Sequence, residues 1–350
     1  MTTMTYPEVE KIKSLITDAE RIVIIQADNP DGDSLGSALA LEHILGDMGK
    51  QPYLYCGADI PGYLSYLPGW DRVSKELPPR FDLSIIVDTS SGSLLENLTK
   101  TGQGMWLASK PCIVIDHHNV EASVAFATIV CNHPAVATGE VIYELAQQLR
   151  WPLNLEAKSA IMTAIMADSL GLMTPATSSR SIHIVAELVE AGVNIPELEN
   201  KRRDMMRKSI DLTRYKGQLL QRIEYFSDDR VATITIPWEE IQEYSPHYNP
   251  SMLVMEDMRL TTNTAIAISF KEYSDGHITA KIRANYGSPI AGKLAEHFGG
   301  GGHEYSSGFK MSTSGRPFNE IKSECIAYAT QLLDKLEQEQ THETLQHTNA

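Results

Sequence analysis

Residues 21–49 read RIVIIQADNPDGDSLGSALALEHILGDMG, and this stretch decides the fold class. It begins with the continuous apolar run RIVIIQA at 21–27, which predicts a buried β-strand. A segment with apolar residues at helical spacing follows at 34–49 and ends at a glycine, which is typical of a helix terminus. Between the two lie Asp31 and Asp33, separated by one glycine. These aspartates either turn the chain from strand to helix or hold a metal ion.

The same alternation of strand and helix continues through the first half of the chain. Strands that alternate with helices are typical of a parallel sheet covered by helices on both faces. We therefore predict an α/β fold with a parallel-sheet N-terminal domain. The further predicted elements are strands at 51–56, 83–88 and 112–116 and helices at 138–150, 156–167 and 179–191.

The second half of the chain has a different pattern. At 350 residues the chain is longer than a single hydrophobic core usually serves, so two domains are expected. Alternating strands, a short helix, four consecutive glycines and a last helix predict a smaller, mixed α/β C-terminal domain. The predicted boundaries are 1–195 for a metal-binding domain, 196–216 for a helical linker, 217–337 for a substrate-binding domain and 338–350 for a disordered, polar tail.

Composition limits the classes of function. The net charge of −15 argues against a stable grip on duplex nucleic acid, which requires many cationic side chains. No apolar run approaches the ~20 residues of a membrane span, and the N-terminus lacks a signal-peptide core, so a cytoplasmic protein without membrane contact is expected. The four cysteines have no C-x-x-C spacing, which favours reduced, buried thiols over disulfides or a zinc site. They are Cys56, Cys112, Cys131 and Cys325.

Acidic and imidazole side chains follow three of the predicted strands at the point where each strand ends. The carboxyl ends of parallel strands meet at one edge of a sheet, where ligands bind. We therefore expect these side chains to lie together, joined by one more aspartate from the end of the helix at 156–167. They are Asp31, Asp33, Asp88, Asp116, His117 and His118, with Asp168 from the helix.

So many carboxylates in one place repel each other unless a cation lies among them. Carboxylates with an imidazole suit Mn²⁺ or Mg²⁺, and a pair of such ions would clamp a phosphate and activate a water. Taken singly, the residues have simpler explanations. Asp33 fits an N-cap for a helix that starts at Ser34. Asp88 fits a turn residue, and Asp168 fits an ordinary helix end.

Five motifs together resemble a known family. NPDGDSLGS, VDTS, DHH and ADS occur in this order and are followed far downstream by FGGGGH. This combination, which spans about residues 20 to 335, resembles the DHH phosphoesterases with their DHH-associated C-terminal domain. Within that family it is most similar to the nanoRNase and pAp-phosphatase branch, which includes hydrolases of cyclic dinucleotides.

The resemblance implies a role for each residue of the predicted cluster. Asp31 and Asp88 would hold one Mn²⁺, and Asp88 would bridge to a second ion, with Mg²⁺ as the substitute metal. The ligands of that second ion would be Asp33, Asp88, His117 and Asp168. Asp116 would steady a ligand, and His118 would approach the scissile phosphate or the leaving group.

One position departs from the family pattern. Members of this branch usually carry a metal-binding histidine three residues before the proline of the first motif, and Ala27 stands there instead. Alanine cannot bind a metal, so the first metal site loses one ligand. The neighbouring Asp28 offers a carboxylate that would compensate. We expect a working but altered site.

The glycine stretch at 299–302 has two readings from the sequence alone. Glycines expose backbone N–H groups without obstruction by a Cβ, which makes a cradle for an anion, or else they form a flexible linker. The resemblance favours the cradle and implies that His303 grips the nucleotide with help from Arg283. Ala284 replaces a common serine, and Tyr305 and Ser306 replace the small residues usual after the histidine. The substrate-binding residues expected here are Arg283, Gly299, Gly300, Gly301, Gly302 and His303.

These observations predict a metal-dependent phosphodiesterase or phosphatase. The resemblance implies very short oligoribonucleotides, linear or cyclic dinucleotides, or 3′-phosphoadenosine 5′-phosphate as the substrate, and it allows a homodimer through the first domain. One alternative is a manganese-dependent pyrophosphatase, although that group normally lacks the glycine-rich segment. The other alternative is a nucleotide-binding sensor with weakened catalysis, which Ala27 suggests.

Overall fold

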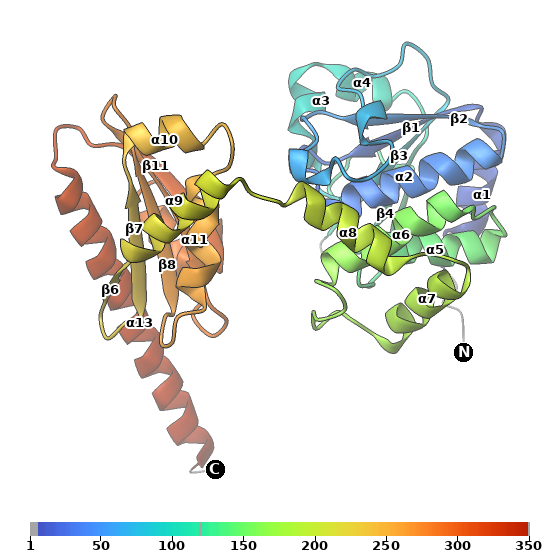
Figure 1. Ribbon diagram of the computed structural model, residues 1–350. Coiled ribbons are helices and arrows are strands. Elements are labelled where there is room, and N and C mark those ends of the chain that lie inside the picture. The colour runs from blue at the N-terminus through green and yellow to red at the C-terminus, as the bar shows by residue number, and fades with distance from the viewer. Residues whose placement is uncertain (1–5, 119–120, 349–350) are drawn as a thin grey trace. The chain divides into compact units, whose positions relative to one another are not determined.

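The computed structural model of the chain describes residues 6–118 and 121–348, and the side chains of 341–348 are outside this description. The chain forms two compact units, Met1–Arg207 and Lys208–Ala350 (Figure 1). The division lies within the 196–216 segment that was predicted as a linker.

The N-terminal unit is built on a five-stranded, all-parallel sheet with the order β2-β1-β3-β4-β5. This sheet confirms the predicted α/β class, because the four long apolar runs of the first half all form its strands. The last strand has only four residues, and the sequence analysis did not predict it. The strands are β1 (Arg21–Gln26), β2 (Gln51–Cys56), β3 (Leu83–Val87), β4 (Cys112–Asp116) and β5 (Ile129–Asn132).

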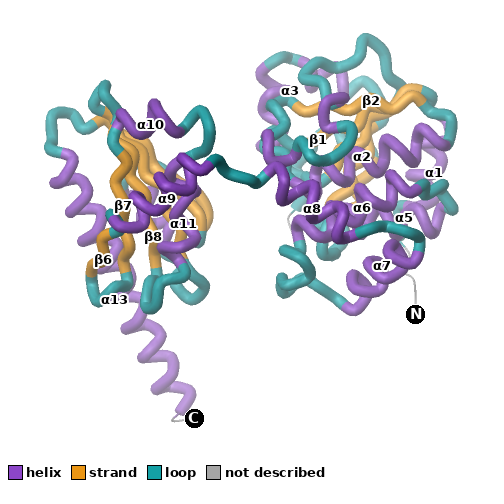
Figure 2. The backbone as a smooth tube through the Cα atoms, in the orientation of Figure 1, coloured by secondary structure: helices purple, strands orange, loops and turns teal. Residues whose placement is uncertain are grey.

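Helices cover both faces of this sheet (Figure 2). Side chains alternate along a strand, so Ile22 and Ile24 of β1 enter one buried cluster and Val23 and Ile25 enter another on the opposite face. The helices of the unit are α1 (Val9–Asp18), α2 (Gly32–Asp47), α3 (Glu96–Lys100), α4 (Gln103–Leu107), α5 (Thr138–Leu149), α6 (Leu155–Asp168), α7 (Ser179–Glu190) and α8 (Ile195–Met205).

Glycines allow α2 to lie directly against α6. A Cβ built on Gly32 would lie 2.5 Å from the Cβ of Ala167, and one on Gly36 would lie 2.9 Å from the carbonyl oxygen of Ala160. Neither position has room for a larger residue. This contact brings the first turn of α2, which carries Asp33, beside the last turn of α6, which carries Asp168.

The C-terminal unit has a six-stranded mixed sheet with the order β10-β11-β9-β8-β7-β6. Only β7 and β8 pair in parallel, and the other neighbours are antiparallel, as the predicted mixed α/β class requires. Its elements are α9 (Ile210–Gln221), β6 (Glu224–Phe226), β7 (Val231–Ile236), α10 (Trp238–Tyr244), α11 (Pro250–Arg259), β8 (Ile266–Glu272), β9 (His277–Ala284), α12 (Ala291–His297), β10 (Gly301–His303), β11 (Ser306–Ser312) and α13 (Phe318–Thr348).

The C-terminal segment differs from the prediction. Residues 338–350 were expected to be disordered, but α13 continues through Thr348, and Figure 1 shows it extending well past the sheet. Glutamate, glutamine and leucine are good helix formers, so a helix that is anchored by its buried first turns can continue beyond them. A polar composition was therefore a poor guide to disorder at this position.

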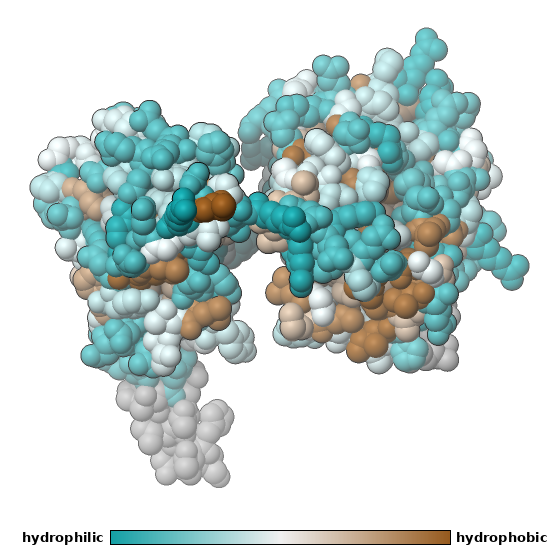
Figure 3. All heavy atoms as spheres, in the orientation of Figure 1, coloured by the Kyte–Doolittle hydropathy of each residue, from teal (hydrophilic) through white to brown (hydrophobic). Residues whose placement is uncertain are grey.

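The thiols agree with the expectation from the cysteine spacing. All four cysteines are free and buried. Among the described residues, no helix combines the length and the apolar character that a membrane crossing needs. Figure 3 shows a mainly hydrophilic surface, with apolar side chains gathered on the N-terminal unit near α7, where Ile182 and Val189 are exposed.

The packing of α2 generates a stability prediction. Gly36→Ala should destabilise the protein by about 1–3 kcal/mol, because the new methyl group overpacks the contact with α6. Gly46→Ala in the same helix is the matched control, since a Cβ there meets nothing within 4 Å and should stabilise by about 0.5–1 kcal/mol. Urea unfolding of the full chain, followed by tryptophan fluorescence, measures both. Equal effects of the two substitutions would contradict the close contact of α2 with α6.

Candidate metal centre

Asp33 lies in the first turn of α2 and is 1% exposed. Its carboxylate accepts hydrogen bonds from the backbone N–H groups of Thr138 (2.6 Å) and Gly139 (3.1 Å) and from the Ser37 hydroxyl (2.9 Å). Thr138 and Gly139 are the first residues of α5, so Asp33 binds the positive end of a second helix. Its position is thus fixed by two helices.

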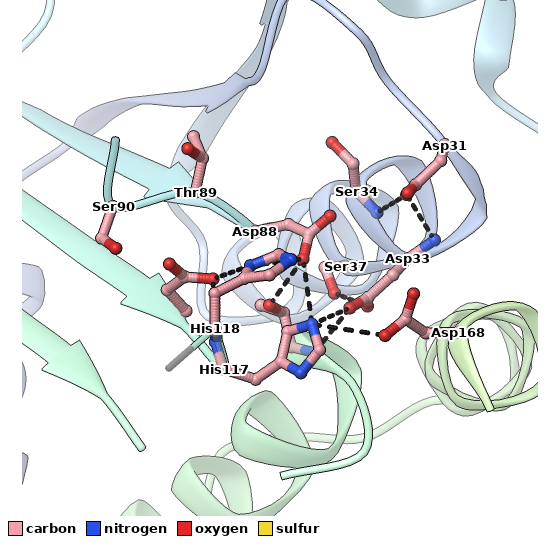
Figure 4. A network of polar contacts seen from close by, with 12 residues as sticks. Asp31, Asp33, Ser34, Ser37, Asp88, Thr89, Ser90, His117, His118 and Asp168 are labelled. Carbon is pink, nitrogen blue, oxygen red and sulfur yellow. Dashed lines mark hydrogen bonds and ion pairs between the residues drawn. The ribbon is translucent and has the colours of Figure 1, made fainter. Parts of the chain in front are cut away.

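Asp88 directly follows β3 and adopts a left-handed backbone conformation, with φ at 60°. Such a conformation is unfavourable for residues other than glycine, although aspartate and asparagine tolerate it best, and it is found most often at functional sites. The Thr138 hydroxyl donates a 3.0 Å hydrogen bond to Asp88 Oδ1. The strained turn aims this buried carboxylate towards Asp33 and His117 (Figure 4).

His117 presents one ring nitrogen to three carboxylates. Its Nε2 lies 3.6 Å from Asp33 Oδ2, 3.6 Å from Asp88 Oδ1 and 3.4 Å from Asp168 Oδ2. The other nitrogen, Nδ1, lies 3.1 Å from the carbonyl oxygen of Ala135, which can only accept, so Nδ1 carries the proton of the neutral ring. Nε2 then offers a lone pair, and it is buried without a hydrogen-bond partner. A lone pair that faces three carboxylates is the arrangement that a cation satisfies.

The electrostatics of the carboxyl groups fit a cation equally well. Burial raises the pKa of Asp88 well above its usual range, and the neighbouring charges of Asp33 and Asp31 raise it further. Burial likewise raises the pKa of Asp33 and that of Asp168. A divalent ion would stabilise the ionised carboxylates, and an oxygen-rich set with one imidazole suits Mn²⁺ or Mg²⁺. The donor set therefore fits the metal predicted from the sequence.

Asp116 holds His118 in place. This aspartate is fully buried, and its Oδ1 accepts hydrogen bonds from the backbone N–H of His117 (2.8 Å) and from the ring Nδ1 of His118 (2.7 Å). The bond to Asp116 raises the pKa of His118, whose side chain is about half exposed. Burial acts to raise the pKa of Asp116, but hydrogen bonds from His118 and Ser90 bring it below its usual value. His118 is therefore held as a ring that can carry a proton beside the carboxylates.

Asp31 and Asp33 have exchanged the roles that their spacing suggested. Asp31, not Asp33, is the N-cap of α2, because its Oδ1 accepts hydrogen bonds from the N–H groups of Asp33 and Ser34, each 3.0 Å long (Figure 4). The N-cap prediction for Asp33 was wrong, since the helix starts at Gly32 and places Asp33 inside its first turn. Among the described residues, Asp31 is in neither of the two groups of ligand atoms that gather around His117.

The structure gives Asp28 a different task from the one suggested for it. Its Oδ2 accepts a 2.9 Å hydrogen bond from the backbone N–H of Asn97 in the first turn of α3. Asp28 is therefore engaged with α3 through one carboxylate oxygen, beside the buried Ala27.

The glycine-rich segment is only partly the expected cradle. The N–H groups of Gly299 and Gly300 donate to the carbonyl oxygens of Glu296 (3.0 Å) and Ala295 (2.9 Å) at the end of α12, so they are not available to an anion. Gly302 pairs with Ser307 between β10 and β11, and a Cβ on Gly302 would lie 2.6 Å from the Ser306 carbonyl oxygen. Close approach of two strands thus explains a glycine that we had assigned to anion binding.

Arg283 and His303 come together through the register of the C-terminal sheet. Ser306 of β11 pairs with His303 of β10 on one side and with Arg283 of β9 on the other. Residues directly opposite each other point to the same face of a sheet, so the three side chains share one face. Burial and the nearby Arg259 lower the pKa of Arg283. This placement agrees with the predicted pairing of Arg283 and His303.

The sequence analysis missed the residues that hold the acidic cluster. Thr138 contacts both Asp33 and Asp88, and Ala135 fixes the proton on His117. Ala135 lies between β5 and α5 and Thr138 begins α5, and the only sequence signal here was the helix start at Thr138.

Comparison with known proteins finds similarity to one family. The model of the DHH family, N-terminal domain, matches residues 21–174. This part of the chain is similar to the DHH family. The chain is 24% identical over 283 residues to the bifunctional oligoribonuclease and PAP phosphatase NrnA of Thermus thermophilus, with 80% of this chain and 81% of that protein covered. It is 22% identical to the protein of the same name from Bacillus subtilis, with 83% of this chain and 88% of that protein covered.

Solved structures of DHH-like proteins share the fold. An exopolyphosphatase-related protein from Bacteroides fragilis superimposes with a TM-score of 0.78 and 21% identity, covering 93% of this chain and 95% of that one. RecJ of Thermus thermophilus in complex with Mn²⁺ superimposes with a TM-score of 0.51 and 16% identity, covering 94% of this chain and 56% of that one. The family resemblance and the fold inferred from the five motifs are thereby confirmed.

The site predicts opposite effects of one substitution in two conditions. Asp88→Asn keeps the left-handed backbone and the acceptor for Thr138 but removes a buried charge. With chelator, the variant should melt a few degrees above the wild type, because repulsion with Asp33 is relieved. With saturating Mn²⁺ the melting temperature of the wild type should rise by about 2–4 °C per kcal/mol of binding energy, and that of the variant should rise much less.

Thermal melts of the full chain measure both effects. Asp71→Asn, which removes an exposed carboxylate of the same unit, is the control. It should change neither the melting temperature in chelator nor the shift produced by Mn²⁺. A Mn²⁺ shift in Asp88→Asn equal to that of the wild type would contradict the metal site.

Proposed function

We propose that this protein is a metal-dependent phosphoesterase that hydrolyses very short nucleotides. The observation that carries the proposal is the lone pair of His117 Nε2 facing the carboxylates of Asp33, Asp88 and Asp168. Acidic side chains that gather around one imidazole at the carboxyl ends of parallel strands suit a divalent metal and phosphoryl chemistry.

The substrate class is supported by the relatives. Several proteins that match most of this chain are named bifunctional oligoribonuclease and PAP phosphatase. We therefore propose short oligoribonucleotides, dinucleotides and 3′-phosphoadenosine 5′-phosphate as substrates. The acidic net charge fits this choice, because a short nucleotide needs only a local patch of cations.

The proposed metal is Mn²⁺, with Mg²⁺ as the substitute. A DHH-like structure that shares the fold was determined with Mn²⁺. Asp33, Asp88, His117 and Asp168 would hold one ion, and Asp31 with Asp88 would hold a second. When bound, such ions act as Lewis acids that polarise a phosphoryl oxygen and lower the pKa of water. Asp31 has one carboxylate oxygen engaged in capping, and Ala27 contributes no ligand, so we propose that the second ion is held more weakly.

Residues of the chain would supply the proton chemistry. His118 is proposed as the general acid that protonates the departing oxygen, because its ring is half exposed and carries a raised pKa. Asp116 is proposed as its positioning residue, since its carboxylate fixes Nδ1 and leaves the other nitrogen to face the substrate. Arg283 and His303 of the C-terminal unit would bind the nucleotide. A homodimer, which the family resemblance allows, stays a prediction.

The two alternatives differ from this proposal in the reaction expected. A pyrophosphatase would hydrolyse pyrophosphate, and a sensor would bind a nucleotide without hydrolysing it. The chain has the paired Arg283 and His303 in its C-terminal sheet, which a nucleotide would use and pyrophosphate would not need. The complete set of Asp33, Asp88, His117 and Asp168 favours turnover over binding alone. We therefore rank the nucleotide phosphoesterase first.

The test is hydrolysis of an RNA dinucleotide and of 3′-phosphoadenosine 5′-phosphate by the full chain with Mn²⁺. The wild type should release mononucleotides and phosphate, and chelator should abolish both. His118→Asn, which keeps a donor towards Asp116, should lower kcat by about a hundredfold or more while changing KM little. His183→Asn alters an exposed histidine on α7 and serves as the matched control.

The alternative readings would appear as distinct results. Rapid hydrolysis of pyrophosphate with no release of mononucleotides would replace the proposal with a pyrophosphatase. Tight binding of the dinucleotide without turnover would support the sensor. Equal kcat values for the wild type and His118→Asn would remove His118 from the proposed chemistry.

A further inference from the structure

Two exposed tyrosines face each other at one end of the C-terminal sheet. Tyr286, which is 97% exposed, follows β9, and Tyr305, which is 37% exposed, lies in the turn between β10 and β11. Their rings are nearly parallel, with an interplanar angle of 14° and centroids 6.4 Å apart. An aromatic ring as exposed as that of Tyr286 gains little from folding and is accessible to a ligand.

The spacing of these rings differs from that of a tyrosine pair in contact. Tyr215 and Tyr244 in the same unit stack directly, with centroids 3.7 Å apart and an angle of 6°. Stacked bases in a nucleic acid strand are spaced by about 3.4 Å, so one base between two rings requires about 6.8 Å. The distance between the ring centroids of Tyr286 and Tyr305 is close to this value.

Backbone hydrogen bonds hold the two tyrosines in this relation. The carbonyl oxygen of Tyr305 accepts a 3.0 Å bond from the N–H of Ala284, which ties the β10–β11 turn to the end of β9. The side chain of Asn285 donates to the carbonyl oxygens of Arg259 and Thr264, each at 2.7 Å, and so anchors the residue before Tyr286. The backbone positions of the two tyrosines are thus set before any ligand enters.

Cationic residues occupy the two strands that lead into the pair. Arg283 is three residues before Tyr286 and directly opposite Ser306, which follows Tyr305. Lys281 lies two residues further along β9, and His303 occupies the neighbouring strand. Aromatic rings next to basic side chains are the combination that binds single-stranded nucleic acids, with stacking on the base and charge on the phosphate.

We propose that Tyr286 and Tyr305 form a clamp that holds one nucleobase of the substrate between their rings, while Arg283 holds the adjacent phosphate. This inference rests on the proposed function for its ligand, a short nucleotide. It adds a specificity that the acidic cluster does not supply. Purines overlap both rings more fully than pyrimidines, so the clamp favours a purine.

Binding without turnover tests the clamp directly. The full chain is titrated, in chelator, against an RNA dinucleotide that contains 2-aminopurine, whose fluorescence falls when its ring stacks. Wild-type protein should quench the fluorescence and bind. Tyr286→Ala and Tyr305→Ala should each weaken binding by about tenfold or more, since base stacking contributes about 1–3 kcal/mol.

Two further variants separate stacking from folding. Tyr286→Phe and Tyr305→Phe keep the rings and should retain quenching and affinity. Tyr225→Ala removes a tyrosine of similar exposure to Tyr305, 38%, from the far edge strand of the same sheet and should bind as the wild type does. Wild-type quenching by the two alanine variants, or its loss in the phenylalanine variants, would overturn the clamp.

Turnover distinguishes failure of the clamp from failure of the proposed function. With Mn²⁺, the alanine variants should raise KM for the dinucleotide about tenfold and leave kcat within twofold. A dinucleotide that lacks the clamped base should show no difference between these variants and the wild type. Hydrolysis with no effect of the alanine substitutions would overturn the clamp and leave the phosphoesterase standing. Quenching that depends on both tyrosines, without hydrolysis, would support the clamp and overturn the phosphoesterase.

Discussion

The lone pair of His117 Nε2 is the constraint on which the rest of the site depends. The proton on Nδ1 is committed to the carbonyl oxygen of Ala135, so the buried Nε2 presents its lone pair to the surrounding carboxylates. Such an arrangement is unfavourable without a cation, because burial already disfavours the ionised forms of Asp33, Asp88 and Asp168. Folding energy from elsewhere must therefore hold these groups together, and a metal would then bind a site that is already formed.

The N-terminal unit provides that energy by close packing around the cluster. Glycines in α2 admit α6 at a distance that no side chain would allow, and this contact sets Asp33 beside Asp168. The start of α5 neutralises part of the charge on Asp33 through two backbone N–H groups. The left-handed turn after β3 then aims Asp88 into the same space. The helix contact, the two backbone hydrogen bonds and the left-handed turn each cost conformational freedom, and together they bring the carboxylates close to one another.

Much of this arrangement could be predicted from residues, and the failures have physical causes. Long apolar runs such as 21–27 identified β1 to β4, and strand ends located Asp88, Asp116 and both histidines. The short strands β5 and β10 lack enough residues for a pattern. Sequence spacing could not decide whether Asp31 or Asp33 caps α2, because the choice depends on which residue begins the helix. Contacts of Thr138 with Asp33 and Asp88 depend on segments far apart in the chain, which one sequence does not bring together.

Location of manganese in the folded protein tests the central claim most directly. A crystal of the full chain soaked in Mn²⁺ should show an anomalous peak within bonding distance of His117 Nε2 and of carboxylate oxygens from Asp33, Asp88 and Asp168. A second, weaker peak near Asp88 and Asp31 would agree with the loss of a ligand at Ala27. Absence of any peak at His117 in a crystal that binds Mn²⁺ elsewhere would contradict the account, because the lone pair would then face the carboxylates without a cation.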